Sequence, residues 1–365
     1  MYNYLHQLKN WYILLIMEKS IMKKQLIAAA VATSVSAIAL ADISITGNAN
    51  YEYFAKENTL GHKSNDADTE VNLKVTGKTG DTTVVANFEV TSSTDYAVTD
   101  SGDDSGFDVE DVYMTTKIGD FNIKAGDFAS GTTALAGEID NGGRALNKVD
   151  INTTVGGIKV GYAVASSKDT AGDNSDYSSL GTDSAAVYAS TTVNGITLAV
   201  KEQSDTYFMW GAKGSVAGVD FRIEDKDNDS GTDALFYEVG SKFGDINVSY
   251  AAIDASAVSV VTEDDSSIFA REMAASNAGL PGVDGVSQVT VSTVVDGTTL
   301  TAKVGELRGI ATKQDAGFSQ IAAKRKLASG ATINVSYDDY ETHNVGTGTA
   351  MTDTQVLEID LSIAF

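Results

Sequence analysis

The sequence contains no cysteine, one proline and three histidines in 365 residues. Without cysteine the chain cannot form a disulfide framework, a thiolate metal site or a cysteine nucleophile. His6 lies ahead of a segment that resembles a leader, and neither His62 nor His343 lies near a glycine-flanked nucleophile elbow. Glycine-rich phosphate loops are also missing from the sequence. The composition therefore argues against an enzyme and indicates no resident cofactor.

Basic residues are scarce. The chain has 26 Lys and Arg against 50 Asp and Glu, which gives a formal net charge of −24. Residues 1–41 hold four lysines and one glutamate, so the remainder carries −27. A field of this sign repels nucleic acid and attracts cations. We therefore expect no nucleic-acid partner.

A long apolar run occurs only near the amino terminus. Lys23 and Lys24 precede an uncharged stretch from Leu26 to Leu40, which ends in Ala39-Leu40-Ala41. This order predicts a secretory signal peptide over 22–41 with cleavage after Ala41. A membrane anchor is the alternative, but the stretch is shorter than the roughly 20 residues that a spanning helix needs.

The predicted chain organisation follows from this leader. Residues 1–21 precede the basic region, and we interpret them as an upstream extension from a misassigned start. Residues 42–365 then form one mature domain. No later window of about 18 apolar residues could span a bilayer as a helix.

Alternation of apolar and polar residues dominates the mature part. In the last segment, apolar residues at every second position from Leu357 to Phe365 alternate with Glu358, Asp360, Ser362 and Ala364. A period of two is typical of strands with one apolar face. The same pattern occurs at 71–76, 158–164, 219–224, 246–250 and 333–337.

Two kinds of connection join these segments. The short ones are glycine turns, which predict β-hairpins: 77–80, 119–120, 156–157, 194–195, 217–218, 244–245, 296–297 and 329–330. The others are longer and acidic: 57–68, 95–106, 129–147, 168–183, 225–233, 255–285, 307–317 and 341–353. Strict alternation of the two kinds predicts an all-β, antiparallel up-and-down transmembrane barrel with short periplasmic turns and long extracellular loops.

The turns predict the number of strands. Eight short turns imply about 18 strands. The connection near Ser204 is so short that it could be a bend within one strand, which leaves about 16 open. Aromatic residues near strand ends, Phe54, Tyr207, Trp210 and Phe236 among them, are expected to form the interfacial girdles of such a barrel.

The combined pattern resembles the general, trimeric porin family of Gram-negative outer membranes. A leader precedes glycine-turned hairpins, and the last strand ends in Leu361-Ser362-Ile363-Ala364-Phe365. Alternating Leu361, Ile363 and Phe365 resemble the carboxyl-terminal signal that the outer-membrane insertion machinery reads. The glycine often found earlier in that strand is absent here. The resemblance implies a homotrimer surrounded by outer-membrane lipid and lipopolysaccharide.

The resemblance also implies a constriction. In this family the third long loop folds into the barrel and places acidic groups opposite a basic wall. The corresponding loop here is 129–147, so Glu138, Asp140 and Arg144 are the expected constriction residues. An ordinary exposed loop is the alternative.

Alternation also assigns residues to the lumen, because a charge that faces hydrocarbon costs about 2–4 kcal/mol at the membrane midplane. The basic residues expected on the lumen wall are Lys74, Lys124, Lys159, Lys201 and Arg222. Further expected lumen groups are Lys303, Lys324, Lys326, Glu52, Glu89, Glu224, Glu238, Asp338 and Glu358. A mixed lumen hydrates ions and polar solutes, and the acidic excess predicts mild cation selectivity.

One loop resembles the start of a calcium site. Asp225, Asp227 and Asp229 alternate, but the glycine is one place late and Phe236 stands where a bidentate glutamate belongs. We interpret this segment as a solvated acidic loop that recruits Ca²⁺ or Mg²⁺ loosely.

Three functions compete. Passive diffusion of ions and small hydrophilic solutes through a water-filled channel fits the pattern best. An adhesin-like barrel that binds cations or surfaces through its acidic loops is the alternative, although the loops leave little room for a binding domain. A soluble β-solenoid or sandwich lacks support, because no fixed repeat appears and an apolar terminal strand would aggregate in water.

Overall fold

The fold is seen in a computed structural model. It describes residues 42–58, 63–93, 107–129, 144–165, 184–204, 206–229, 231, 233–255, 285–309, 314–344 and 354–365. The predicted extension over 1–21 and the predicted signal peptide over 22–41 lie outside these residues. Among the described residues there is no helix long and apolar enough to cross a membrane.

The described residues form 18 strands. The first nine are β1 Asp42–Asn58, β2 Lys63–Thr79, β3 Thr82–Ser93, β4 Phe107–Ile118, β5 Phe121–Ala129, β6 Arg144–Val155, β7 Ile158–Ala165, β8 Ser184–Val193 and β9 Ile196–Gln203. The others are β10 Tyr207–Val216, β11 Val219–Asn228, β12 Asp233–Phe243, β13 Ile246–Ala255, β14 Gly285–Val295, β15 Thr298–Gly309, β16 Gln314–Lys326, β17 Thr332–Asn344 and β18 Thr354–Ala364.

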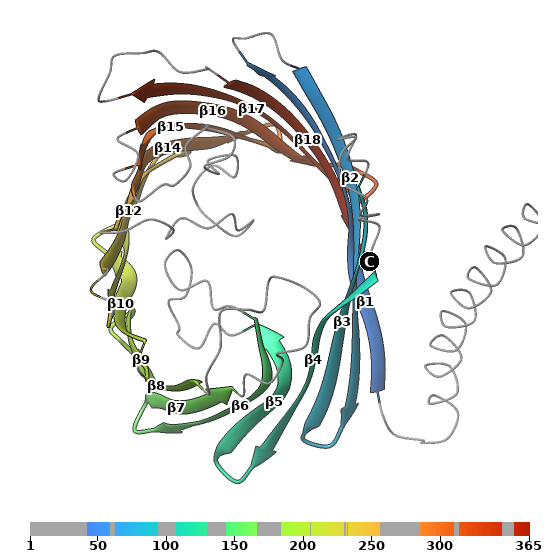
Figure 1. Cartoon of the computed structure of the whole chain (residues 1–365), viewed down its shortest axis with the longest axis vertical. Coiled ribbons are helices and arrows are strands. Elements are labelled where there is room, and N and C mark those ends of the chain that lie inside the picture. Colours follow the sequence, from blue (N-terminus) through green and yellow to red (C-terminus); the bar gives the residue numbers. More distant parts are fainter. Residues whose placement is uncertain are drawn as a thin grey trace, which may run out of the picture.

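Each strand pairs with its neighbours in sequence, always antiparallel, and β18 pairs with β1 to close the ring (Figure 1). This confirms the predicted all-β up-and-down barrel and its 18 strands. The short connection near Ser204 joins two separate strands, because β9 pairs with β10 from Gln203 opposite Tyr207 onwards. It is therefore a hairpin and not a bend.

A hairpin turn occurs at each of the eight predicted places, but the first lies at 80–81 and not at 77–80, because residues 77–79 still pair with β3. In four of these turns both central residues have positive φ, as type I′ hairpin turns require. One of these is Gly156-Gly157; in the other three, Asn194, Ala217 and Asp296 occupy the first central position with φ of 52°, 53° and 49°, each followed by glycine. Asparagine and aspartate adopt this left-handed backbone with less strain than alanine.

Strand pairing extends further toward the long connections than the sequence indicated. Strands β1 and β2 pair as far as Glu57 opposite Lys63, and β15 and β16 pair up to Gly309 opposite Gln314. The predicted connections 57–68 and 307–317 are therefore too long. Backbone hydrogen bonds across each hairpin outweigh the weak strand propensity of the Asn, Asp and Lys residues there.

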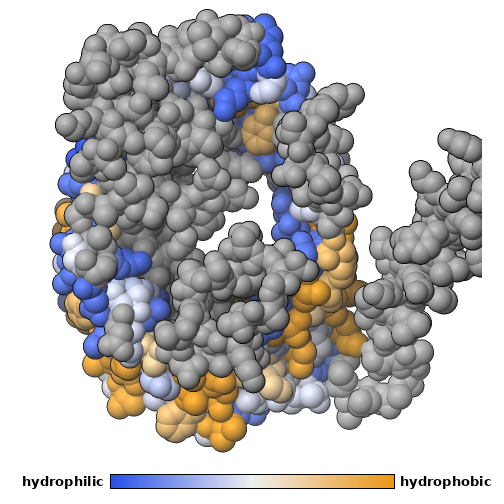
Figure 2. All heavy atoms as spheres, viewed as in Figure 1, coloured by the Kyte–Doolittle hydropathy of each residue, from blue (hydrophilic) through white to orange (hydrophobic). Residues whose placement is uncertain are grey.

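The two faces of the sheet differ in chemistry. On the outer face, large apolar side chains such as Ile321 and Phe243 are 68% and 66% exposed, a surface that suits lipid. Figure 2 shows hydrophobic atoms along the outside of the wall and hydrophilic atoms on its inner side, where an opening passes through the molecule along the view. Polar residues that alternate with these apolar ones therefore face the lumen.

The closing pair has a specific contact at the chain terminus. Gly47 and Phe365 exchange two backbone hydrogen bonds, each with an N···O distance of 2.9 Å. A Cβ on Gly47 would lie 2.9 Å from the Phe365 ring, so the ring rests on the glycine. The last residue of the predicted insertion signal thus also completes the closure. Its reading by insertion machinery stays a prediction.

Replacing Ala217 with asparagine is expected to stabilise the barrel by about 1 kcal/mol, because asparagine adopts the left-handed backbone with less strain. Urea unfolding of the protein in lipid vesicles would measure the change. Asn194→Ala, which makes the opposite exchange at an equivalent turn position, should destabilise by a similar amount. An unchanged or lower midpoint for Ala217→Asn would contradict this explanation.

Replacing Gly47 with alanine is expected to lower the yield of folded barrel, since the new Cβ meets the Phe365 ring and backbone of β2. The folded fraction can be read from the heat-sensitive mobility of barrels on gels. Gly77→Ala is the matched control, because nothing lies within 4 Å of a Cβ there. Equal yields for the two variants would show that the contact between Gly47 and the Phe365 ring does not affect folding.

Candidate functional site: the lumen

The inner face of β5–β11 carries a series of cations, which we call the basic wall. It consists of Lys124, Lys148, Lys159, Lys201, Lys213, Arg222 and Lys226. Three carboxylates, Asp150, Asp220 and Glu224, interrupt it on the same face. This stretch of lumen is therefore net positive, although the chain as a whole is strongly acidic.

Aromatic rings lie beneath the cations of the basic wall. The Lys124 Nζ is 3.9 Å from the Tyr113 ring centroid and 4.0 Å from that of Phe128. Lys226 Nζ and Lys201 Nζ lie 4.3 and 5.0 Å from the Tyr207 ring. Each contact is within the range of a cation–π interaction, about 6 Å. The rings hold the charges close to the wall while leaving them positive.

Asp150 is the best-supported carboxylate of the basic wall. The Tyr188 hydroxyl donates to both of its oxygens at 2.9 and 3.1 Å, and the Asn152 amide donates at 2.9 Å. Asp150 and Tyr188 are both buried. These neutral donors satisfy a buried charge that would otherwise be unfavourable.

The inner face of β17, β18, β1 and β2 carries the opposite charge, and we call it the acidic wall. It consists of Asp338, Glu358, Asp360, Glu52, Asp68 and Glu70, and two lysines, Lys56 and Lys74, lie on the same face. In Figure 1 these strands lie at the upper right and β5–β10 at the lower left. Strands β3 and β4 separate the two walls on one side and β12–β16 on the other.

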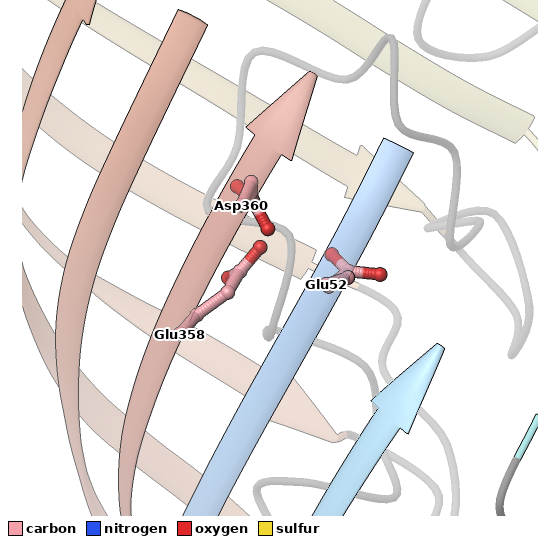
Figure 3. Close-up of side chains that lie close together, drawn as sticks. All are labelled: Glu52, Glu358 and Asp360. Carbon is pink, nitrogen blue, oxygen red and sulfur yellow. The ribbon is translucent and has the colours of Figure 1, made fainter. Parts of the chain in front are cut away.

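Three carboxylates of the acidic wall lie together. Glu358 and Asp360 follow one another along β18, and Glu52 is beside them on β1 (Figure 3). One ligand oxygen of each lies within 4.8 Å of the others, close enough to share a cation. Asp360 pairs with Glu52 across the closing seam, so barrel closure itself creates this group.

Neutral side chains hold the acidic wall in place. Asn334 Nδ2 donates to Asp360 at 2.9 Å, and Ser336 Oγ donates to Glu358 and to Asp338 at 3.3 Å each. Gln320 Nε2 donates to Asp338 at 2.7 Å. Hydrogen bonds from neutral donors therefore position these three carboxylates.

The sequence-predicted lumen residues divide between the two walls. Lys124, Lys159, Lys201 and Arg222 lie together on the basic wall. Lys74 lies instead beside the acidic wall, opposite Thr46 and Asn87. Alternation places each residue on a face but gives no information about which residues share a side of the ring. The part that these residues play in conduction stays a prediction.

The expected constriction is only partly visible. Glu138 and Asp140 lie outside the described residues. Arg144 was predicted to lie in a loop but is the first residue of β6, opposite Ala129 of β5. Strand pairing resumes there across a β-bulge between Gly126 and Phe128, which the sequence pattern did not reveal.

The predicted calcium-like loop is also shorter than expected. Asp225 and Asp227 belong to β11, where Asp225 pairs with Leu235 and Asp227 with Asp233. Only Asp229 lies in the connection. Asp225 accepts a hydrogen bond of 2.8 Å from the Trp210 indole on the outer face. Alternate positions on a strand place these carboxylates in a row, and a calcium-binding loop requires a curved chain.

The lumen is apolar at the loop end of β10–β18. Buried inward side chains there form one cluster: Tyr207, Met209, Phe236, Ile253, Val286, Leu307, Phe318, Tyr340 and Val356, with Phe54 against them. Phe54, Tyr207 and Phe236 were expected in the aromatic girdles, and this expectation was wrong. Near these strand ends, apolar residues face inward and polar residues face outward. Apolar residues are required on the outer face only where the strand contacts lipid.

No protein-family model matches the chain, and no curated protein matches it in sequence. Solved structures do match in fold. Pseudomonas aeruginosa OccK9 (OpdG) has a TM-score of 0.62 with 12% identity over 89% of this chain and 99% of that one. Acinetobacter baumannii OccAB1 has a TM-score of 0.61 with 10% identity over 89% and 96%.

A third match is Pseudomonas aeruginosa OccK2 (OpdF) in complex with glucuronate, with a TM-score of 0.60 and 10% identity over 89% of this chain and 98% of that one. These are 18-stranded outer-membrane porins, and at this identity they show the fold alone. They are Occ porins and not general trimeric porins. The trimeric state therefore rests only on the sequence resemblance.

Proposed function

We propose that this chain is an outer-membrane porin that lets ions and small hydrophilic solutes diffuse passively through its lumen. The observation that carries the proposal is the pair of charged walls on the inside of a closed barrel whose outside is apolar. Charged groups line the interior in both signs, as hydrated solutes require. The fold shared with outer-membrane porins supports the same function.

We propose mild cation selectivity. The chain as a whole carries −24, so both mouths lie in a negative field. Cations are concentrated in such a field, and salt reduces the effect because it screens charge.

The partners follow from the same proposal. The OccK2 structure holds glucuronate, a hydrophilic carboxylate, and the basic wall of this chain offers donors for such a group. Lipid and lipopolysaccharide surround the barrel, and three copies of the chain assemble into a trimer. The outer-membrane insertion machinery recognises Leu361, Ile363 and Phe365. Loosely held Ca²⁺ or Mg²⁺ at the acidic rim, including Asp225, Asp227 and Asp229, is the only metal in this proposal.

The alternative is an adhesin-like barrel whose loops bind cations or surfaces. The described residues favour the channel, because inward carboxylates such as Asp150, Asp338 and Glu358 are held by specific hydrogen bonds. A barrel that serves only as an anchor needs no such arrangement.

The full chain, expressed in a Gram-negative host and extracted from its outer membrane, should produce stepwise ohmic conductance in a planar bilayer. Under a KCl gradient the reversal potential should shift toward that of K⁺, more strongly at low salt. Insertion without conductance would reject the channel and favour the adhesin-like alternative. Absence of the protein from the outer membrane would reject the proposed location.

Removing charge from the acidic wall should weaken cation selectivity. The double variant Glu52→Gln, Asp360→Asn is expected to move the reversal potential toward zero, because two lumen charges are lost. Glu306→Gln, Asp339→Asn removes two charges from the outer face and is the matched control. Equal shifts in both variants would show that selectivity depends on overall charge and not on the wall.

A further inference from the structure

Glycines lie opposite aromatic residues on the inner wall in three places. Gly161 of β7 pairs with Tyr188 of β8, Gly126 of β5 with Tyr113 of β4, and Gly305 of β15 with Phe318 of β16. At Gly161 and Gly305 an added Cβ would run into the aromatic ring itself. These rings therefore lie flat over the neighbouring strand instead of projecting into the lumen.

The Gly161 pair has the clearest consequence. The Tyr188 hydroxyl reaches Asp150 on β6 at 2.9 and 3.1 Å, although β7 lies between β8 and β6. Strands two apart are separated by roughly 10 Å, so the side chain must cross β7. It crosses at Gly161, where no side chain blocks it, and the next inward residue of β7 is the small Ala163.

The contact at this position involves one group only. The three atoms nearest to an added Cβ on Gly161 all belong to the Tyr188 ring. At Gly126 and Gly305, in contrast, the nearest atom is a backbone oxygen of the neighbouring strand. A side chain at 161 would thus displace Tyr188 and leave the sheet in place.

We infer that Gly161 is a positioning residue that sets the width and charge of the channel through Tyr188. This inference rests on the proposed channel function. With glycine present, the ring lies against the wall and its hydroxyl binds Asp150. With any larger residue the ring turns into the barrel interior, narrows the passage, and leaves Asp150 with one donor fewer among the lysines of the basic wall.

Single-channel conductance of the full chain tests this inference. Gly161→Ala should lower the conductance and shift the reversal potential, and Gly161→Val should lower it further. In a Tyr188→Ala background the same glycine substitution should have no effect, because no ring remains to be displaced. Gly240→Ala is the matched control, since that inward glycine meets only Ser249 and the backbone of β13, no closer than 3.2 Å.

The outcomes separate this inference from the channel function. A native protein that does not conduct overturns the proposed function. A conducting native protein with an unaffected Gly161→Ala variant, or an equal loss in the Tyr188→Ala background, overturns the positioning role alone. If Gly161→Ala does not fold, the double variant must recover folding, because Tyr188 is what the new Cβ meets; failure to recover also overturns the role.

Discussion

The structure depends on satisfying every backbone hydrogen-bonding group within the sheet. Inside a bilayer no water replaces a missing partner, so a sheet can span it only when its two edges pair with each other. Here β1 and β18 pair from Asn48 opposite Ala364 to Asn58 opposite Thr354, and Gly47 with Phe365 extends that ladder to the last residue. Closure also brings Glu52 beside Glu358 and Asp360, so this group of three carboxylates exists only in the closed ring.

Once the ring is closed, each strand has one face toward lipid and one toward the interior. The outer face admits few charges, so the charged residues gather inside, where they must be held apart or paired. The two walls do this differently. On the basic wall, aromatic rings lie beneath Lys124, Lys201 and Lys226. On the acidic wall, amide and hydroxyl groups of Asn334, Ser336 and Gln320 hold the carboxylates. Both arrangements hold charged groups against the inner face of the barrel.

The fold was predictable because its determinants are local. Period-two alternation and eight glycine turns were sufficient to predict an 18-stranded barrel. The short connection after Gln203 joins two separate strands, so the predicted number of strands was correct. The long connections were less predictable. Asp225, Asp227 and Arg144 have low strand propensity or stand outside the apolar pattern, yet hairpin hydrogen bonds continue through them.

The lumen was harder to predict, because its contacts join residues far apart in sequence. Face assignment placed Lys74, Lys124 and Lys201 correctly on the inner side, but it could not show that Lys74 lies on β2, beside the acidic wall. The apolar interior around Phe236 violates the simple rule that apolar residues point outward. Asp360 was missed because its neighbours become visible only when the first strand is aligned with the last. Aligning β1 with β18 in the sequence, as barrel closure requires, would have placed Asp360 beside Glu52.

Opposite charge on two sides of one passage acts on more than the net charge of a solute. A molecule that carries both an ammonium and a carboxylate experiences a torque, which turns its positive end toward β18 and β1 and its negative end toward β5–β11. Water dipoles between the walls align in the same sense. In the proposed channel such a molecule passes in a restricted range of orientations, and its shape seen from that direction decides whether it fits.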